Sequence, residues 1–386
     1  MANRTWSEWF CLPPSVTFKD VEETTGEPYP NFLEFWKWAL IFGAALYIFR
    51  DYILIPLILK PIGLRAGVRS RPYAAPPPNK TLEDLYAVNR ARPPRQLLTA
   101  AASRINWSER AVERWLRKKA LSSQMTTLEK FCDMGWQGFF YSCFFITGIF
   151  IVLPQDYVWD PSLVLSDMPY QRTPAIIWWY CAFDCGFYVT QMYTLLTLDR
   201  RHDFYVMLSH HVVVFSINSI CLSVNAIKIL SLSVLIHEVA DIPLSLAKMC
   251  DYSSGKKYVT ALMAIFTVVW IITRLGLYPM LVIKPLLVYK STSDFEVWPA
   301  FIMGFTSMFV LLFLHCVWTL ELAKAIKNKL SKKEGFADGR SSGEELSEDE
   351  SMTENTKMNE IHEKNNVPRK RITGGSEKQF VVSSTG

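Results

Sequence analysis

Hydrophobic residues in this chain are gathered into long runs that alternate with polar stretches. A helix needs about 20 mostly apolar residues to cross the hydrocarbon core of a bilayer. Seven runs approach or exceed that length, at about 35–59, 135–153, 175–196, 206–224, 227–246, 259–283 and 300–322. The pattern therefore predicts an all-α, polytopic membrane protein with about seven transmembrane helices.

The polar stretches between these runs are short, with three exceptions. Residues 1–34 contain no basic segment before a short apolar core, so we expect no cleavable signal peptide and a first span that serves as a signal anchor. A basic, proline-containing stretch at about 60–130 is expected to lie outside the membrane. Residues 333–386 are rich in Ser, Glu, Lys and Asn, which predicts a disordered tail. In this tail Ser342 and Ser347 precede acidic residues, as in substrates of acidophilic kinases; a merely solvated tail is the alternative.

Charge is distributed unevenly along the chain, although the net charge is only +5. With seven spans, the basic segments fall on one side of the membrane, at 60–130, 199–201, 256–257 and 324–333. The connections on the other side are acidic or mixed, at 155–172 and 284–299. The positive-inside rule assigns the basic side to the cytosol. We therefore expect a lumenal N-terminus and a cytosolic C-terminus.

The fourth and fifth spans carry most of the polar residues that lie within apolar runs. Only Asn225 and Ala226 separate these spans, which predicts a tight helical hairpin. The fourth span holds His210, His211 and Asn218. The fifth holds polar residues at offsets of 0, 4, 8 and 11, which form one stripe along a helix: His237, Asp241, Ser245 and Lys248. Because an ionisable residue in a span costs at least about 2.5–3.5 kcal/mol, each one is a functional candidate.

Three other spans each contain one such residue, and simple helix pairing is the alternative role for all of them. For Asp184 in the third span and Arg274 in the sixth, both interpretations stay open. For His315 in the seventh span, helix pairing is the favoured interpretation. The double histidine is different, because one of two consecutive side chains must point away from any single partner. We therefore expect His210 and His211 to be functional.

The residue types in the hairpin favour acyl or proton transfer. Histidine is a base or nucleophile near neutral pH, and an aspartate can orient an imidazole and stabilise its cation. A di-iron lipid hydroxylase is the metal-dependent alternative, but the chain has six histidines and no HxxHH box. The eight cysteines are scattered, mostly within apolar runs. We expect no metal site, no disulfide framework and no cofactor.

Short segments of the fourth and fifth spans carry a resemblance to a known family. Asp203-Phe204 precedes the double histidine, and residues 237–241, HEVAD, follow at the spacing of an HDxxD motif. With Asn225 and residues 247–249, these segments resemble the longevity-assurance motif of ceramide synthases. The resemblance covers about residues 30–335 and implies a transmembrane catalytic domain of the TLC type at 131–332.

Two further segments match this family and four positions depart from it. Residues 273–279 resemble the SRL…P of the sixth span, and residues 184–188 resemble E/D-x-x-F-Y. The family's first Asp of HDxxD is Glu238 here, and a Glu that is usual in the family is Ser245. The turn that reads Asn-Tyr-x-Arg in the family is Asn225-Ala226-Ile227-Lys228.

Residues 75–127 resemble the truncated Hox-like segment found in animal ceramide synthases. Residues 108–119 are similar to a homeodomain recognition helix, but Lys118 stands where a DNA reader needs a base-contacting Asn. We therefore expect no nucleic-acid partner. The cluster Arg117, Lys118 and Lys119 is interpreted as a surface for anionic lipid headgroups or acyl-CoA phosphates, with a solvated helix as the alternative.

The resemblance implies an N-acyltransferase of the endoplasmic reticulum membrane that joins a fatty acyl-CoA to a sphingoid base, making dihydroceramide or ceramide. An imidazole would take a proton from the amine, or His210 would first accept the acyl group. Asp241 would orient an imidazole or neutralise the sphingoid ammonium. The expected catalytic residues are His210, His211, His237 and Asp241, and the expected substrate-binding residues are Asp184, Asn218, Asn225, Lys248 and Arg274.

Further expectations concern partners and specificity. Besides the two substrates, the partners would be membrane lipids and, as homo- or heterodimers, related synthases. The connection at about 284–298 would help to set acyl length. A non-catalytic lipid sensor and a membrane-tethered nucleic-acid binder stay as alternatives, which an acyl-transfer assay and a salt-dependent DNA-binding assay would separate.

Overall fold

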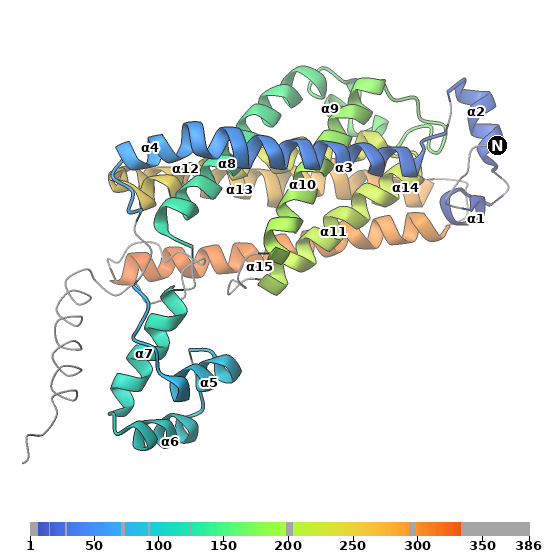
Figure 1. Ribbon diagram of the computed structural model, residues 1–386. Helices are drawn as coiled ribbons and strands as arrows, with labels where there is room; N and C mark the ends of the chain where they lie inside the picture. The colour runs from blue at the N-terminus through green and yellow to red at the C-terminus, as the bar shows by residue number, and fades with distance from the viewer. Residues whose placement is uncertain are drawn as a thin grey trace, which may run out of the picture. The chain divides into compact units, whose positions relative to one another are not determined.

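The computed structural model describes residues 7–14, 16–27, 29–70, 74–91, 93–122, 125–197, 204–292 and 298–332. Every regular element within these ranges is a helix, and all of them belong to the unit Met1–Phe336 (Figure 1). A second unit, Ala337–Gly386, lies outside the described residues, as do the predicted tail and Asp203 of the motif.

Six helical segments of the described chain are long and apolar enough to cross a membrane. The first joins α3 (Phe32–Ile48), the π-helical η1 (Phe49–Leu59) and α4 (Lys60–Arg65). The next three are α8 (Thr127–Ile151), α11 (Phe204–Ser223) and α12 (Ile227–Tyr252). The fifth runs through η3 (Lys256–Tyr258), α13 (Val259–Trp270), the π-helical η4 (Ile271–Leu277) and η5 (Pro279–Ile283), and α14 (Lys284–Thr292); the sixth is α15 (Pro299–Lys332). The predicted all-helical, polytopic architecture is confirmed.

The third predicted span is the helix α10 (Ala175–Thr197), which is not among these six. Its length of 23 residues is sufficient, but polar aromatic residues, threonines and Asp184 make it less apolar. Near its start, Asn225 Nδ2 donates to Pro169 O (2.9 Å) and Gln171 O (3.0 Å) at the turn between α11 and α12. Near its other end, Arg50 donates to Thr194 Oγ1 (3.4 Å). The helix α10 therefore lies within the bundle beside α3 and α11.

Small residues allow several of these helices to approach closely. A Cβ atom at Gly186 of α10 would lie 2.9 Å from Ala39 O and from Gly43 N of α3. A Cβ atom at Gly138 of α8 would lie 3.1 Å from the Cβ of Ser245 on α12. Close approach at Gly, Ala and Ser is the usual way in which membrane helices pack, because the lipid offers no hydrophobic driving force between them. Ser245, the position where the family usually has Glu, is thus a buried contact between α8 and α12.

This packing makes a prediction for Ser245. Ser245→Ala keeps the small volume that the crossing with Gly138 requires, so turnover should stay within about twofold of wild type and Tm should hardly change. Ser245→Leu adds volume at the same crossing and should destabilise the protein by about 1–3 kcal/mol. Thermal unfolding in detergent checks both variants. A large loss in Ser245→Ala alone would mean that the hydroxyl has a role of its own.

Two groups of short helices lie outside the long spans. The helices α5 (Lys80–Asn89), α6 (Arg95–Ile105) and α7 (Glu109–Ser122) share a small core, and Trp115 Nε1 donates to Pro77 O (2.7 Å). Their likeness to a Hox domain stays a prediction. The other group comprises α1 (Glu8–Cys11), α2 (Phe18–Thr25), α9 (Asp156–Trp159) and η2 (Pro161–Leu163).

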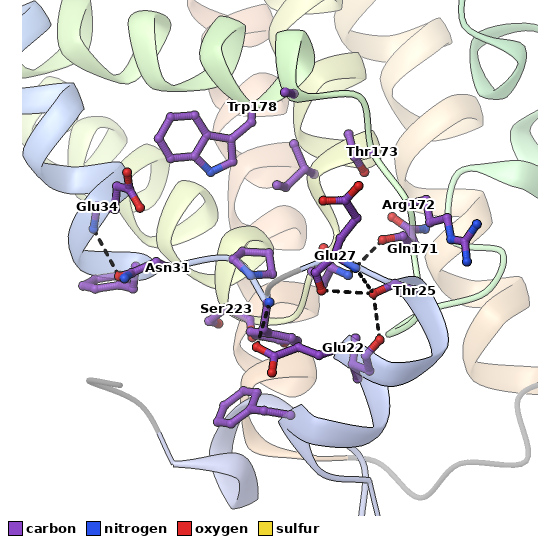
Figure 2. A pocket seen from close by; sticks show the side chains of 18 of the residues that line it. Glu22, Thr25, Glu27, Asn31, Glu34, Gln171, Arg172, Thr173, Trp178 and Ser223 are labelled. Carbon is purple, nitrogen blue, oxygen red and sulfur yellow. Dashed lines mark hydrogen bonds between the residues drawn. The ribbon is translucent and has the colours of Figure 1, made fainter. Parts of the chain in front are cut away.

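The N-terminal helices α1 and α2 are attached to the bundle beside the turn between α11 and α12. Tyr29 donates its hydroxyl proton to Ser223 O (2.7 Å), and Arg172 donates to Thr24 O (3.1 Å). Burial raises the pKa of Cys11 to about 12, so this thiol stays protonated. A hollow of about 570 Å³ lies between this segment and the starts of α10 and α12 (Figure 2). Gln171 and Asn225 line this hollow, which is separate from the cavity described next.

Candidate active site

A small cavity of about 50 Å³ is lined by the helices α10, α11, α12 and α15 and by Tyr278, which lies between η4 and η5. Four of the nine predicted site residues line it: Asp184, His210, Asn218 and His237. Tyr188, Ser233 and Tyr278 add polar groups that the sequence did not single out as site residues. The rest of the wall is aliphatic, from Val214, Ile217, Leu230, Val234, Met308 and Leu311. A few polar groups in an apolar wall are typical of a ligand site.

The two consecutive histidines have different surroundings, because side chains at i and i+1 diverge on a helix. His210 lines the cavity and its ring meets Trp318 of α15 edge-on, with 5.3 Å between ring centroids. His211 does not line the cavity and packs against the ring of Tyr188 at 6.0 Å. The Nδ1 atoms of both rings are buried without a hydrogen-bond partner among the described residues. Of this pair, His210 is therefore the imidazole that faces the cavity.

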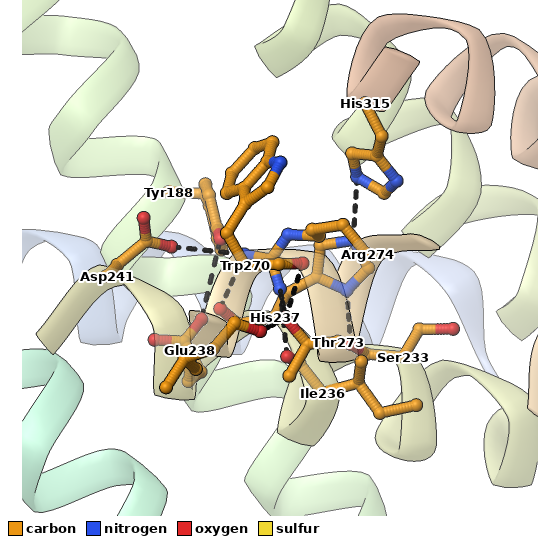
Figure 3. Close-up of polar contacts among 11 residues, drawn as sticks. Tyr188, Ser233, Ile236, His237, Glu238, Asp241, Trp270, Thr273, Arg274 and His315 are labelled. Carbon is orange, nitrogen blue, oxygen red and sulfur yellow. Dashed lines mark hydrogen bonds and ion pairs between the residues drawn. The ribbon is translucent and has the colours of Figure 1, made fainter. Parts of the chain in front are cut away.

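Arg274 connects the sixth span to the polar stripe of α12 (Figure 3). Its guanidinium donates to the carbonyl oxygens of Ile236 (2.8 Å) and His237 (2.7 Å) and pairs with Asp241 Oδ2 (3.4 Å). The residue is only 3% exposed and lies in the π-helical η4; such irregular turns are frequent at functional sites. A buried charge needs partners of this kind. These contacts correspond to helix pairing, which is one of the two interpretations that the sequence left open for Arg274.

The contacts of Asp241 differ from the predicted ones. Its carboxylate pairs with Arg274, and within the described part of the chain no hydrogen bond joins it to an imidazole. The predicted role of orienting an imidazole therefore has no counterpart in this geometry. Asp241 is also outside the lining of the small cavity. Its visible effect is to hold the guanidinium that binds the backbone of α12.

His237 is held through both ring nitrogens. Its Nδ1 lies 2.5 Å from Ser233 O, and because a carbonyl oxygen can only accept, this nitrogen carries the proton. Its Nε2 lies 3.2 Å from Nε2 of His315. His315, expected to serve only helix pairing, is thus in direct contact with a predicted catalytic residue (Figure 3).

Two acidic side chains are buried beside the cavity. Asp184 is 0% exposed, and neither carboxylate oxygen has a hydrogen-bond partner among the described residues. Glu238 is 1% exposed and accepts a hydrogen bond from Tyr188 (3.4 Å) through one oxygen. An unpartnered carboxylate in an apolar interior is costly, so these groups indicate a place for a polar ligand group or a bound proton. The sequence indicated Glu238 and Tyr188 only as motif positions, since periodicity does not show which side chains meet.

Comparison with known proteins identifies the family of this chain. The family model of the TLC domain matches residues 130–324, which contain the whole cavity. Human ceramide synthase 5 is 30% identical over 363 residues, covering 91% of this chain and 89% of that protein. The chain belongs to the ceramide synthase family. Mouse ceramide synthase 4 is 26% identical over 358 residues (92% and 90%), and ceramide synthase hyl-2 of Caenorhabditis elegans is 23% identical over 352 residues (85% and 90%).

Two residues expected from the ceramide synthase motif to bind substrate lie away from the cavity. Asn225 adopts a left-handed conformation (φ 55°) in the turn between α11 and α12, where its amide bonds Pro169 O and Gln171 O. Asn is one of the few residues that accept this conformation readily, so the turn accounts for its presence. Lys248 lies on α12 nearly two turns beyond Asp241 and does not line the cavity. The polar lining of the cavity is completed by Tyr188, Ser233 and Tyr278.

No group of three or more His, Cys, Asp or Glu side chains within the described ranges is placed to hold a metal ion. The polar groups that line this ceramide synthase site are imidazoles, a carboxyl group, an amide and hydroxyls. An imidazole at the edge of an apolar cavity can transfer a proton or form an acyl adduct. Both reactions suit acyl transfer between lipid-soluble molecules.

Proposed function

We propose that this protein transfers a fatty acyl group from acyl-CoA to the amine of a sphingoid base, giving dihydroceramide or ceramide. The observation that carries the proposal is His210 in the wall of an apolar cavity inside a bundle of membrane-spanning helices. Membership of the ceramide synthase family supports the same reaction. Both the acyl chain and the acceptor are lipid-soluble, so a cavity within the bilayer brings them together.

In the simplest route the amine nitrogen attacks the thioester carbonyl carbon. A carbon–nitrogen bond forms, the carbon–sulfur bond breaks and CoA leaves as the thiolate. The nitrogen loses a proton, and His210 is placed to accept it. In the alternative route an imidazole nitrogen of His210 attacks the thioester carbonyl carbon, and CoA leaves as the thiolate. The amine then attacks the acyl carbon, the bond between this carbon and the imidazole breaks, and the released imidazole accepts the proton that the amine loses. In the first route His210 is the base, and in the second it is the nucleophile.

The cavity is small for these substrates. About 50 Å³ holds one or two water molecules, so an acyl chain requires the walls to move apart. Met308 and Leu311 of α15 form one wall, and methionine adapts readily to a new neighbour. From His210 the cavity continues along α11 to Asn218, about 12 Å further at 1.5 Å per residue. This direction fits an acyl tail that points away from the thioester.

The decisive assay mixes sphinganine and acyl-CoA with membranes that contain the protein and measures dihydroceramide by mass spectrometry. Dihydroceramide that accumulates with time and with protein amount supports the proposal. A panel of acyl-CoA lengths is used, so that a preference for one chain length is not mistaken for inactivity. Absence of product across the panel, at normal protein levels, would favour a non-catalytic lipid sensor.

For location, we propose the endoplasmic reticulum membrane with a lumenal N-terminus, a cytosolic segment at 60–130 and a cytosolic C-terminus. The sequon at Asn106 is then expected to stay unglycosylated, although this side chain is exposed at the turn between α6 and α7. Gel mobility before and after endoglycosidase treatment checks this. A sequon introduced into the connection at 155–172 is the positive control and should be glycosylated. A glycan on Asn106 would contradict the orientation.

A further inference from the structure

The last helix of the bundle, α15, places one buried histidine against the candidate site. His315 is 1% exposed, and its ring lies 5.1 Å from that of His237 between centroids. The rings of Tyr278 (5.1 Å) and Trp270 (6.0 Å) enclose it on other sides. His315 does not line the cavity itself, so its effect on a ligand must pass through neighbours that do, which are His237 and Tyr278.

The protons between the two histidines can be assigned from their partners. Nδ1 of His237 donates to Ser233 O, so Nε2 of the neutral ring is an acceptor. Nε2 of His315, at 3.2 Å, must then carry a proton and donate it to His237. This leaves Nδ1 of His315 unprotonated, and this atom has no hydrogen-bond partner in the part of the chain that the structure describes. Both nitrogens of His237 are therefore occupied, one as donor and one as acceptor.

The turn of α15 around His315 is itself held in place. Thr319 donates its hydroxyl proton to His315 O (2.7 Å) and accepts from Trp270 Nε1 (3.0 Å). On the same turn, Trp318 packs against His210. One turn of α15 thus supports both imidazoles of the cavity: His315 supports His237, and Trp318 supports His210.

We propose that His315 is a positioning residue for the acyl-transfer site. By donating its Nε2 proton to His237, it fixes the orientation of that ring in the cavity wall beside His210. This inference rests on the proposed function, and it assigns His315 a role beyond pairing helices. Without the donor, Nε2 of His237 would be a buried acceptor without a partner, and the ring would be free to turn. Since small displacements in a site cost large factors in rate, turnover depends on this bond.

Two substitutions of similar shape separate hydrogen bonding from packing. Glutamine can donate an N–H to His237 and methionine cannot, although the two side chains are of equal length. His315→Gln should keep kcat within about threefold of wild type, and His315→Met should lower kcat by about 10- to 100-fold, as is common for residues that orient a functional side chain. The KM for acyl-CoA should change less than twofold in both, because His315 does not touch the cavity. Equal activity of the two variants at matched protein levels would overturn the proposal.

A spectroscopic measurement tests the same bond without relying on turnover. In protein labelled with ¹⁵N-histidine and reconstituted in bilayers, the resonances of His237 are assigned from their loss in His237→Gln. Wild type should show a protonated Nδ1 and an unprotonated Nε2 that accepts a hydrogen bond. The Nε2 resonance should move in His315→Met and stay near its wild-type position in His315→Gln. A protonated Nε2 in wild type, or no shift in His315→Met, would overturn the positioning role even if the acyl-transfer assay showed no product.

Discussion

Replacing His210 with alanine should abolish measurable transfer of an acyl group to sphinganine while the protein inserts and accumulates normally. His210 is the member of the double histidine that lines the cavity, and it acts as the base in one proposed route and as the nucleophile in the other. Loss of a general acid–base group alone typically lowers the rate by 10²–10⁴-fold. Turnover by mass spectrometry at matched protein levels measures the effect.

Two variants serve as controls for His210→Ala. His211→Ala removes a ring that does not line the cavity and that packs on Tyr188, so we expect a smaller loss of turnover, of about tenfold. Val212→Ala changes an exposed side chain of the same helix and should leave turnover unchanged. Near-native turnover in His210→Ala would show that the catalytic assignment is wrong. Equal losses of turnover in His210→Ala and His211→Ala would show that lining the cavity does not decide which of the two histidines is catalytic.

The same variant separates the two routes. Incubation with acyl-CoA alone, followed by intact mass measurement, should reveal an added acyl mass if His210 forms a covalent adduct. The adduct should be absent from His210→Ala and present in His211→Ala. An unmodified mass under trapping conditions, together with full turnover of wild type, would leave direct attack by the amine as the mechanism.

Arg274→Met should be among the most destabilising single changes in the bundle. It removes two hydrogen bonds to carbonyl oxygens of α12 and leaves Asp241 without its cationic partner. Removing one member of a buried pair typically costs about 3–5 kcal/mol, which corresponds to a fall of roughly 6–15 °C in Tm. Thermal unfolding of the detergent-solubilised protein measures this fall in Tm. Turnover should also decline, because Arg274 donates one of these hydrogen bonds to the carbonyl oxygen of His237.

Asp241→Asn is the comparison for Arg274→Met. Asparagine keeps an oxygen that can accept from Arg274, and the two carbonyl acceptors remain in place, so the loss should be clearly smaller. Arg274→Lys retains the charge, but an ammonium group lacks the planar guanidinium that reaches all three acceptors. Its loss of stability should therefore lie between those of the other two variants. If Asp241→Asn abolished turnover at a normal Tm, Asp241 would act in the chemistry and not through Arg274.

Much of the architecture could be predicted because hydrophobic run length reports directly on the bilayer. Six of the seven predicted spans are helices that meet the length and composition of a membrane span. The remaining one, the third predicted span, is the helix α10 at the predicted place, and Asp184, threonines and polar aromatic residues make it less apolar than the others. The motif around the double histidine indicated the right region for the same reason: ionisable residues are rare in spans, so they stand out without any structure.

The partners of these residues could not be predicted, since they come from helices far apart in the sequence. The stripe His237, Asp241, Ser245 and Lys248 is continuous along α12, yet only His237 lines the cavity. Asp241 turns to Arg274, and Ser245 lies against Gly138. Helical spacing predicts which residues share a face of the helix, but it does not predict which residues pack against that face.

The sequence by itself determined the membrane location, the helical class, the hairpin and the family, because run length, loop length and a spaced motif are properties of the chain. Only the tertiary structure decided which imidazole faces the cavity and which groups hold it. His210 is distinguished from His211 by the neighbours that α10 and α15 bring against α11. His315 meets His237 although 78 residues separate them, because α15 packs beside α11 and the π-helical part of the sixth span. Contacts of this range depend on the packing of whole helices, which no local pattern encodes.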